Sequence, residues 1–284
     1  MEILVAKTAG FCFGVRRAME MVESALNEEE RPLYSLGPLI HNPRVVKELE
    51  KEGLQTVESL SQVPGGRVVI RSHGVGPSVY QTARDQKLGV IDATCPFVKN
   101  VQQLAVFLHA EGYQVLIVGE SAHAEVKGVL DSVAGEALVI ESIKTLDTGK
   151  LQPKVGIISQ TTQDLINFQQ ITNAVIPYAK EIRIYNTICL ATSQRQQEVA
   201  ELSRKVDLMI VVGGKNSANT SRLTEISRMN DTPTYQLESA AEIDEAWFQG
   251  IGRVGITAGA STPDQQIKEI IQKLTYLGGI IVNE

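Results

Sequence analysis

Three cysteines, Cys12, Cys95 and Cys189, are the residues of this chain with the most distinctive chemistry. Thiolates are soft ligands that suit zinc or iron–sulfur clusters, and an odd, sparse set of cysteines does not make a disulfide scaffold. Each cysteine follows a short β-like run and has glycine, proline, threonine or asparagine within three residues, as is typical of a loop. We therefore predict that the three cysteines are metal ligands and remain reduced, as in a cytoplasmic protein.

The type of ligand leaves two kinds of metal centre open. Three thiolates without a fourth could hold a cubane iron–sulfur cluster and leave one iron free to bind a substrate oxygen, as an open metal site does in Lewis-acid catalysis. The closely spaced cysteine motifs of ferredoxins and radical enzymes are absent from the sequence. The spacing by itself is therefore a weak signal for a cluster, and zinc remains an alternative.

Two further sets of loops carry polar side chains after strand-like runs. The first set holds His41, then His123 with Glu125, then Ser217 with Asn219, and the second holds His73, then Thr161 with Thr162, then Ser261. Imidazole, hydroxyl and amide groups suit a phosphate or diphosphate, whereas no Walker loop for a nucleotide is present.

Individual side chains in these loops have separate predicted roles. Glu125 is the only acid among them, and a carboxylic acid beside a reacting oxygen could donate protons. Ser217 and Ser261 are predicted both to cap helices and to bind an anion. His109 lies within a helical pattern instead, so we assign it a structural role.

A threefold internal repeat predicts how these loops are positioned. Strand-like and helical runs alternate along the chain, which indicates parallel sheets with right-handed crossovers. We predict an α/β fold of three small units, related by a pseudo-threefold axis, with about four strands each. The units are residues 13–95, 96–187 and 188–275, with residues 1–12 joining the third sheet and 276–284 as a tail. Because ligands bind beyond the carboxyl ends of parallel strands, threefold symmetry would bring all these loops to one central site.

Composition excludes several other functions. The chain has 284 residues, of which 43% are hydrophobic and 21% charged, with a formal net charge of −6. These values are ordinary for a globular protein and disfavour a nucleic-acid binder, which usually has a basic face. The N-terminal residues lack the pattern of a signal peptide, and no apolar run is long enough to span a membrane. The sequence therefore predicts a cytoplasmic enzyme without membrane or nucleic-acid partners.

Nine short strings, in order, give the sequence a specific resemblance. They are AGFCFGVRRA, GPLIHNP, RSHGV, DATCPFV, HAEV, SQTT, NTICLAT, KNSANT and TAGAS, spanning residues 9–261. Together they closely resemble the 4-hydroxy-3-methylbut-2-enyl diphosphate reductase family, which catalyses the last step of the methylerythritol phosphate route to isoprenoids.

The resemblance implies a cofactor, a reaction and a set of roles. It implies one 4Fe–4S cluster per chain on Cys12, Cys95 and Cys189, with an open iron that binds the substrate hydroxyl as an alkoxide. Reductive dehydroxylation with two electrons would then give isopentenyl or dimethylallyl diphosphate. Ferredoxin or flavodoxin would be the electron donor. Glu125 would supply protons, and Thr161 would place the hydroxyl and relay them. The implied diphosphate ligands are His41, His73, His123, Ser217, Asn219 and Ser261, and Thr162 belongs to the same substrate-binding set.

The sequence departs from the family pattern at Ala218, where a second serine is usual before the asparagine. We expect this change to weaken substrate binding rather than the chemistry. Two rival functions remain. One is another cluster enzyme with three dispersed cysteines, such as quinolinate synthase or the diphthamide radical enzyme, and the other is a phosphometabolite-binding protein with structural zinc. The histidine, glutamate and Ser–Asn loops favour a diphosphate substrate over the first.

Overall fold

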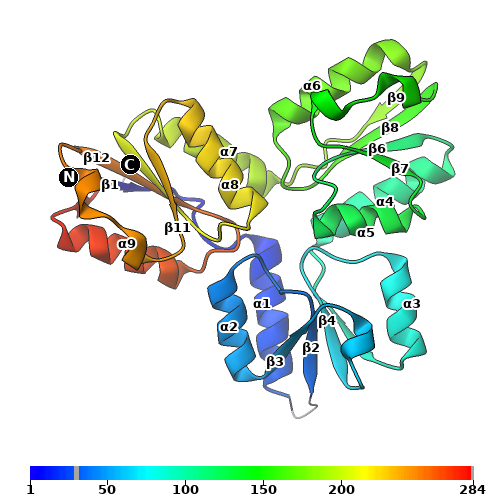
Figure 1. The fold of residues 1–284 in the computed structure, drawn as a ribbon, viewed down its shortest axis with the longest axis horizontal. Coiled ribbons are helices and arrows are strands. Elements are labelled where there is room, and N and C mark those ends of the chain that lie inside the picture. The colour runs from blue at the N-terminus through cyan, green and yellow to red at the C-terminus, as the bar shows by residue number, and fades with distance from the viewer. Residues whose placement is uncertain (29–31, 283–284) are drawn as a thin grey trace. The chain divides into compact units, whose positions relative to one another are not determined.

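The computed structural model describes residues 1–28 and 32–282. They form an α/β fold with three parallel sheets, which confirms the predicted fold class (Figure 1). The chain folds into two compact units. Unit 1 comprises residues 1–15, 41–45 and 190–284 and contains sheet A; unit 2 comprises residues 16–40 and 46–189 and contains sheets B and C. The predicted limits at residues 95 and 187 separate the strands of the three sheets, and their standing as domain boundaries remains a prediction.

Sheet B has four parallel strands in the order β3-β2-β4-β5. Its strands are β2 (Leu33–Leu36), β3 (Leu54–Val57), β4 (Arg67–Ile70) and β5 (Gly89–Asp92), and its helices are α1 (Phe13–Leu26), α2 (Pro43–Glu52) and α3 (Pro77–Asp85). Helix α1 begins directly after Cys12, and its Val15, Ala18 and Val22 are buried.

Sheet C repeats this arrangement with the order β7-β6-β8-β9. Its strands are β6 (Gln114–Val118), β7 (Ala137–Ile140), β8 (Lys154–Ser159) and β9 (Glu181–Ile184), and its helices are α4 (Pro96–Ala110), α5 (Ala124–Ser132) and α6 (Leu165–Val175). Helices α4 and α5 pack on one face through Val115 and Ile117, and α6 packs on the other through Leu116 and Ile157. Covering both faces explains why the central strands are apolar throughout.

Sheet A lies in unit 1 and has five strands in the order β11-β10-β12-β1-β13. Its strands are β1 (Glu2–Val5), β10 (Leu208–Val212), β11 (Thr234–Leu237), β12 (Arg253–Ala258) and β13 (Ile280–Ile281), and its helices are α7 (Leu190–Leu202), α8 (Ala218–Met229) and α9 (Asp264–Tyr276). Helices α7 and α8 pack on one face, through Leu4 and Met209 of the sheet, and α9 on the other, through Ile3 and Ile210. Figure 1 shows these helices on the two faces of the sheet.

The first strand pairs in parallel with β12, with Ile3 beside Val254, so the N-terminal strand joins the third sheet as predicted. The segment predicted as a C-terminal tail contributes more than expected, because its residues Ile280 and Ile281 form β13 and pair with β1. None of the helices in the described residues is long and apolar enough to cross a membrane.

Candidate functional site

Each sheet has a point at which the strand order reverses, and the loops that leave the sheet there carry the predicted polar residues. The reversal falls between β2 and β4 in sheet B, between β6 and β8 in sheet C, and between β10 and β12 in sheet A. In open parallel sheets, the loops at this point diverge and leave a crevice for a ligand. The six loops hold His41 and His73, then His123 and Thr161, then Ser217 and Ser261.

The cysteines occupy an equivalent place next to these loops. In each sheet, one cysteine follows the fourth strand of the spatial order. These strands are β5 before Cys95, β9 before Cys189 and β1 before Cys12. Each lies directly before a helix, and Cys95 is the N-cap of α4 with proline at the first helical position. All three are half-buried thiols rather than disulfides in the described part of the chain. The N-terminal end of a helix favours negative charge, so this donor set fits thiolate ligands and an anionic cluster.

Glu125 in α5 forms the best-defined interaction among the predicted residues. Its carboxyl group is buried, with 2% of the residue exposed. The Thr161 backbone N–H donates to Oε1 at 2.6 Å, and the Thr161 hydroxyl lies 2.7 Å from Oε2. The carbonyl of Thr161 accepts a hydrogen bond from the Cys189 N–H at 2.9 Å. Unit 2 therefore joins the predicted acid, the predicted relay and one cysteine in a continuous hydrogen-bonded chain.

Burial raises the pKa of Glu125 to about 7, although the two hydrogen bonds from Thr161 act in the opposite direction. Oε1 must remain an acceptor, because a backbone N–H can only donate. When Glu125 is protonated, its proton therefore lies on Oε2 and points to the Thr161 hydroxyl. A group with this pKa is protonated in part of the population at neutral pH, which suits a general acid.

His123 is fixed at the start of the same helix. Its Nδ1 accepts from the Glu125 N–H at 3.2 Å, so His123 caps α5. An accepting Nδ1 carries no proton, and the imidazole in its neutral form then carries one on Nε2, where it can donate to an anion. The His73 ring lies edge-on to His123 with 5.4 Å between centroids. The loops after β4 and β6 thus bring two imidazoles together in unit 2.

Gln160 is a site residue that sequence reasoning missed. It is buried, its Oε1 accepts from the Glu120 N–H at 3.0 Å, and its Nε2 donates to the Thr162 hydroxyl at 2.9 Å. The side chain therefore ties the loop after β6 to the loop after β8. Thr162 is held by this contact, whereas Thr161 is held by Glu125. In the sequence, only the position of Gln160 directly before the Thr161–Thr162 pair pointed to this role.

In unit 1, Ser217 and Asn219 lie at the start of α8. Ser217 is the N-cap, and its Oγ accepts from the Thr220 N–H at 3.3 Å, as predicted. Asn219 is 6% exposed, and neither atom of its amide has a hydrogen-bond partner among the described residues. A buried amide without hydrogen bonds destabilises the folded protein. The presence of one here is explained if a polar ligand hydrogen-bonds to it. Gly259 permits this arrangement, because a Cβ there would lie 2.1 Å from the Thr220 hydroxyl.

The loops that carry His41 and Ser261 meet within unit 1. Ser261 Oγ donates to the His41 carbonyl at 3.2 Å, and Asn42 Nδ2 donates to the Ser261 carbonyl at 3.0 Å. The prediction that Ser261 caps a helix is wrong, because the N-cap of α9 is Pro263 and has no side-chain cap. The proline two residues later ends the turn and displaces Ser261 from the helix start. Asn42 is a second residue that sequence reasoning missed, although it lies next to His41.

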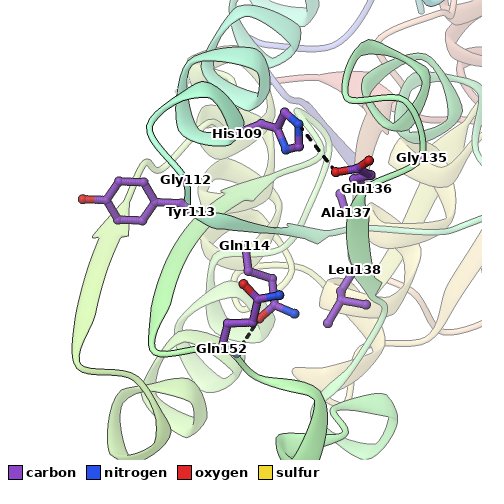
Figure 2. Close-up of a pocket in the computed structure, with 9 residues that line it drawn as sticks. All are labelled: His109, Gly112, Tyr113, Gln114, Gly135, Glu136, Ala137, Leu138 and Gln152. Carbon is purple, nitrogen blue, oxygen red and sulfur yellow. Dashed lines mark hydrogen bonds and ion pairs between the residues drawn. The ribbon is translucent and has the colours of Figure 1, made fainter.

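His109 lies away from these loops, at the amino end of sheet C. Its Nε2 is 3.7 Å from a Glu136 carboxylate oxygen at the surface. Figure 2 shows both residues together with Gln114 and Gln152. These residues line an open hollow of about 420 Å³, in which Gln114 Oε1 accepts from the Gln152 N–H at 2.8 Å. The hollow is lined by the starts of β6 and β7, whereas the predicted site residues follow the carboxyl ends of strands. This placement agrees with the structural role predicted for His109.

Comparisons with known proteins agree with this arrangement. The family model described as "LytB protein" matches residues 3–275. A 4-hydroxy-3-methylbut-2-enyl diphosphate reductase from Geobacter metallireducens is 45% identical over 96% of this chain and 97% of its own length. The reductase of the same name from Trichlorobacter lovleyi is 46% identical over 96% and 98%.

Two solved structures share the fold. One, titled as (E)-4-hydroxy-3-methyl-but-2-enyl diphosphate reductase, the terminal enzyme of the non-mevalonate pathway, is 42% identical with a TM-score of 0.73, covering 97% of this chain and 99% of its own. The other, titled as E-1-hydroxy-2-methyl-but-2-enyl-4-diphosphate reductase from Plasmodium falciparum, is 29% identical with a TM-score of 0.91, covering 100% and 92%.

The fold, the buried acid and these similarities define an α/β metabolic enzyme of the reductase class. The family can then be stated directly. The chain belongs to the LytB family, since the family model and the relatives span nearly its whole length.

Proposed function

We propose that this chain is a 4-hydroxy-3-methylbut-2-enyl diphosphate reductase. The substrate's terminal carbon–oxygen bond breaks, the oxygen leaves as water, and the carbon skeleton gains one hydrogen to give isopentenyl or dimethylallyl diphosphate. Two electrons and two protons balance the reaction. The buried Glu125, bonded to Thr161 at the carboxyl end of sheet C, is the observation that carries the proposal, because a carboxyl group with a pKa of about 7 beside a hydroxyl is suited to donate a proton.

Cys12, Cys95 and Cys189 are the proposed ligands of one 4Fe–4S cluster. When bound, the cluster would supply the two electrons one at a time and a Lewis-acidic iron for the leaving oxygen. The three thiols at helix starts fit this group in ligand type and in charge. The electron donor, ferredoxin or flavodoxin, and the cytoplasmic location are parts of the same proposal.

Side chains of the chain itself would transfer the protons and bind the diphosphate. Glu125 holds the proton on Oε2 and passes it to the Thr161 hydroxyl, whose own proton moves on to the leaving oxygen. The Nε2–H of His123 donates to the substrate diphosphate, and His41 and His73 extend this anion site. Ser217, Asn219 and Ser261 provide hydroxyl and amide donors, and Thr162 lies beside the relay. Buried donors aimed at an anion also exclude water from the reacting centre.

A direct assay tests this function. The chain is purified without oxygen, reduced with dithionite and a viologen mediator, and given the hydroxylated diphosphate. We expect isopentenyl and dimethylallyl diphosphate together with water as products. Binding of the substrate without turnover, by a protein that carries zinc and no sulfide, would instead support the phosphometabolite-binding alternative.

Asn219→Ala should separate binding from stability. Because both amide atoms lack hydrogen-bond partners within the described part of the chain, we expect the free energy of unfolding to stay within about 1 kcal/mol of the parent value, while the KM rises about tenfold. Asn42→Ala is the matched control, since its amide donates to Ser261 and Gln266 and accepts from Arg44. Denaturant unfolding should show a loss of about 2–3 kcal/mol for Asn42→Ala. A larger loss for Asn219→Ala than for Asn42→Ala would contradict the binding role.

Ala218→Ser should strengthen substrate binding. Ala218 is the first residue of α8, between the capping Ser217 and the buried Asn219, so a hydroxyl there adds a donor next to both. We expect the KM to fall by about two- to tenfold with little change in kcat, which is the effect of one added hydrogen bond. Ala240→Ser, at the start of a short 3₁₀ helix outside these loops, should leave the KM unchanged. An unchanged KM in Ala218→Ser would mean that the missing serine has no consequence.

A further inference from the structure

Arg17 holds the loop that carries Cys95. It lies on α1, and its Nη1 donates to the Thr94 carbonyl at 3.3 Å. Thr94 is buried and directly precedes Cys95, whose own N–H donates to the Ser72 carbonyl at 3.0 Å. The guanidinium is therefore fixed beside the backbone of a proposed cluster ligand.

Arg195 makes the corresponding contact to the loop of Cys12. It lies on α7 and is 5% exposed, and its Nη2 donates to the Gly10 carbonyl at 2.7 Å. One turn further along α7, the Glu198 carboxylate accepts from the Lys7 N–H at 2.6 Å and from the Thr8 N–H at 2.9 Å. Two side chains of one helix thus fix the segment between β1 and Cys12.

In both contacts, a helix that begins directly after one cysteine binds the loop of another cysteine. Helix α1 begins directly after Cys12 and binds the loop of Cys95, and helix α7 begins directly after Cys189 and binds the loop of Cys12. In the loop of Cys189, the Thr187 hydroxyl accepts from the Ser159 N–H, and the Cys189 N–H donates to the Thr161 carbonyl. An arginine side chain therefore contacts the loop of Cys95 and the loop of Cys12.

The charge of Arg17 is not cancelled by a carboxylate in the described residues, since its hydrogen bond goes to a neutral carbonyl. Asp92, which lies three residues before Cys95, is paired with Lys99 at 2.6 Å. A guanidinium remains charged at any pH that the fold survives. The positive potential of Arg17 at the Cys95 loop therefore persists.

We infer that Arg17 and Arg195 are positioning residues for the cluster ligands, and that the charge of Arg17 favours the reduced form of the cluster. Three thiolates make the cluster anionic, and each electron adds a further negative charge. A fixed cation nearby stabilises the more negative form more strongly and raises the reduction potential. This inference rests on the proposed function, because it assumes a cluster on the three cysteines.

Arg17→Gln tests the charge, with Arg16→Gln as the control. Arg16 is the exposed neighbour on the same helix, so both variants remove one positive charge but only one loses the loop contact. Paramagnetic resonance during a redox titration measures the midpoint potential of the cluster. We expect Arg17→Gln to lower the one-electron reduction equilibrium constant about tenfold, or ~59 mV, while Arg16→Gln leaves it unchanged. Arg17→Lys should recover part of the shift. Equal potentials in the two glutamine variants would overturn the charge role.

Arg195 is tested by cluster retention, because it is buried and its loss threatens folding. Arg195→Lys keeps the positive charge but replaces the guanidinium with a single ammonium group. Arg204→Gln is the control, at an exposed residue in the segment directly after α7. We expect iron release to a chelator to be several-fold faster in Arg195→Lys and unchanged in Arg204→Gln, with near-parent circular dichroism in both. Equal release rates would overturn the positioning role. A parent chain that binds no iron and sulfide after anaerobic reconstitution would refute the proposed function itself, which distinguishes the two failures.

Discussion

Replacing Glu125 with glutamine is expected to lower kcat by about 100- to 1,000-fold, which is the usual contribution of a positioned general acid. Glutamine has nearly the same shape, its carbonyl can accept from the Thr161 N–H, and its amide can donate to the Thr161 hydroxyl. The variant should therefore keep its iron and sulfide content and its affinity for substrate. Single-turnover kinetics with the reduced protein measures the loss. A rate within threefold of the parent would remove Glu125 from the proton path.

The pH dependence of kcat in the parent protein should reflect the ionisation of Glu125. Because burial raises the pKa of Glu125 to about 7, the fraction that holds a proton falls as the pH rises through that value. We expect kcat to be level at lower pH and to decline above about 7, and the residual rate of Glu125→Gln to lack this decline. Thr161→Ser, which keeps the relay hydroxyl, serves as the control and should retain the parent profile.

Stability should change with pH in the same direction. The pKa of Glu125 rises from 4.5 in its ordinary state to about 7 in the fold, so its contribution to stability is fully present below 4.5 and is lost as the pH rises through 7. The glutamine variant cannot ionise and loses nothing. We expect it to gain on the parent by about 3 kcal/mol in the free energy of unfolding between pH 5 and 9. Urea denaturation at the two pH values measures this difference.

Cys189→Ser should abolish the proposed cluster. The exchange of sulfur for oxygen removes a soft ligand, while the backbone bond from residue 189 to the Thr161 carbonyl needs no side chain. We expect loss of iron, sulfide and turnover, with a melting temperature close to that of the parent chain without its cluster. Cys12→Ser and Cys95→Ser should behave in the same way. Zinc without sulfide in the parent, or full iron content in any of these variants, would contradict the assignment.

Most of the architecture could be predicted because local patterns encode it. Buried parallel strands such as β10 are continuous apolar runs, and α1 and α4 carry apolar stripes on one face. Helix α7 has a weaker apolar stripe, because its buried face carries Thr192, Arg195 and Gln196 besides Val199 and Leu202. The Arg195 side chain donates to the Gly10 carbonyl in the loop of Cys12. Polar residues on a buried helix face interrupt the apolar periodicity from which such a face is predicted. The contact of this helix with the loop of Cys12 could therefore not be predicted from the sequence.

The candidate site could be predicted only in part. The residues at strand ends were identifiable because parallel topology determines which loops diverge. The contacts between them were not, since Asn42 bonds to Ser261 and Arg195 to Gly10 across long separations in the chain. Only the capping role of Ser261 was predicted wrongly, because a serine beside a turn resembles an N-cap, whereas Pro263 holds that position here. Burial of Glu125, which sets its pKa, depends on the packing of α5 on sheet C and has no local signal.

The pairing of β1 with β12 also determines the order in which the fold can be completed during synthesis. Sheets B and C consist of residues 33–184 and can form as the ribosome proceeds. The strand before Cys12 is made before those sheets, but its partner strand is residues 253–258, so it has no sheet to join until the intervening residues are translated. The Cys12 loop also needs Arg195 and Ala260 before it is fixed. Of the three cysteines, Cys12 is therefore translated before the other two but ordered after them, and loading of the proposed metal centre would follow translation of residues 253–260.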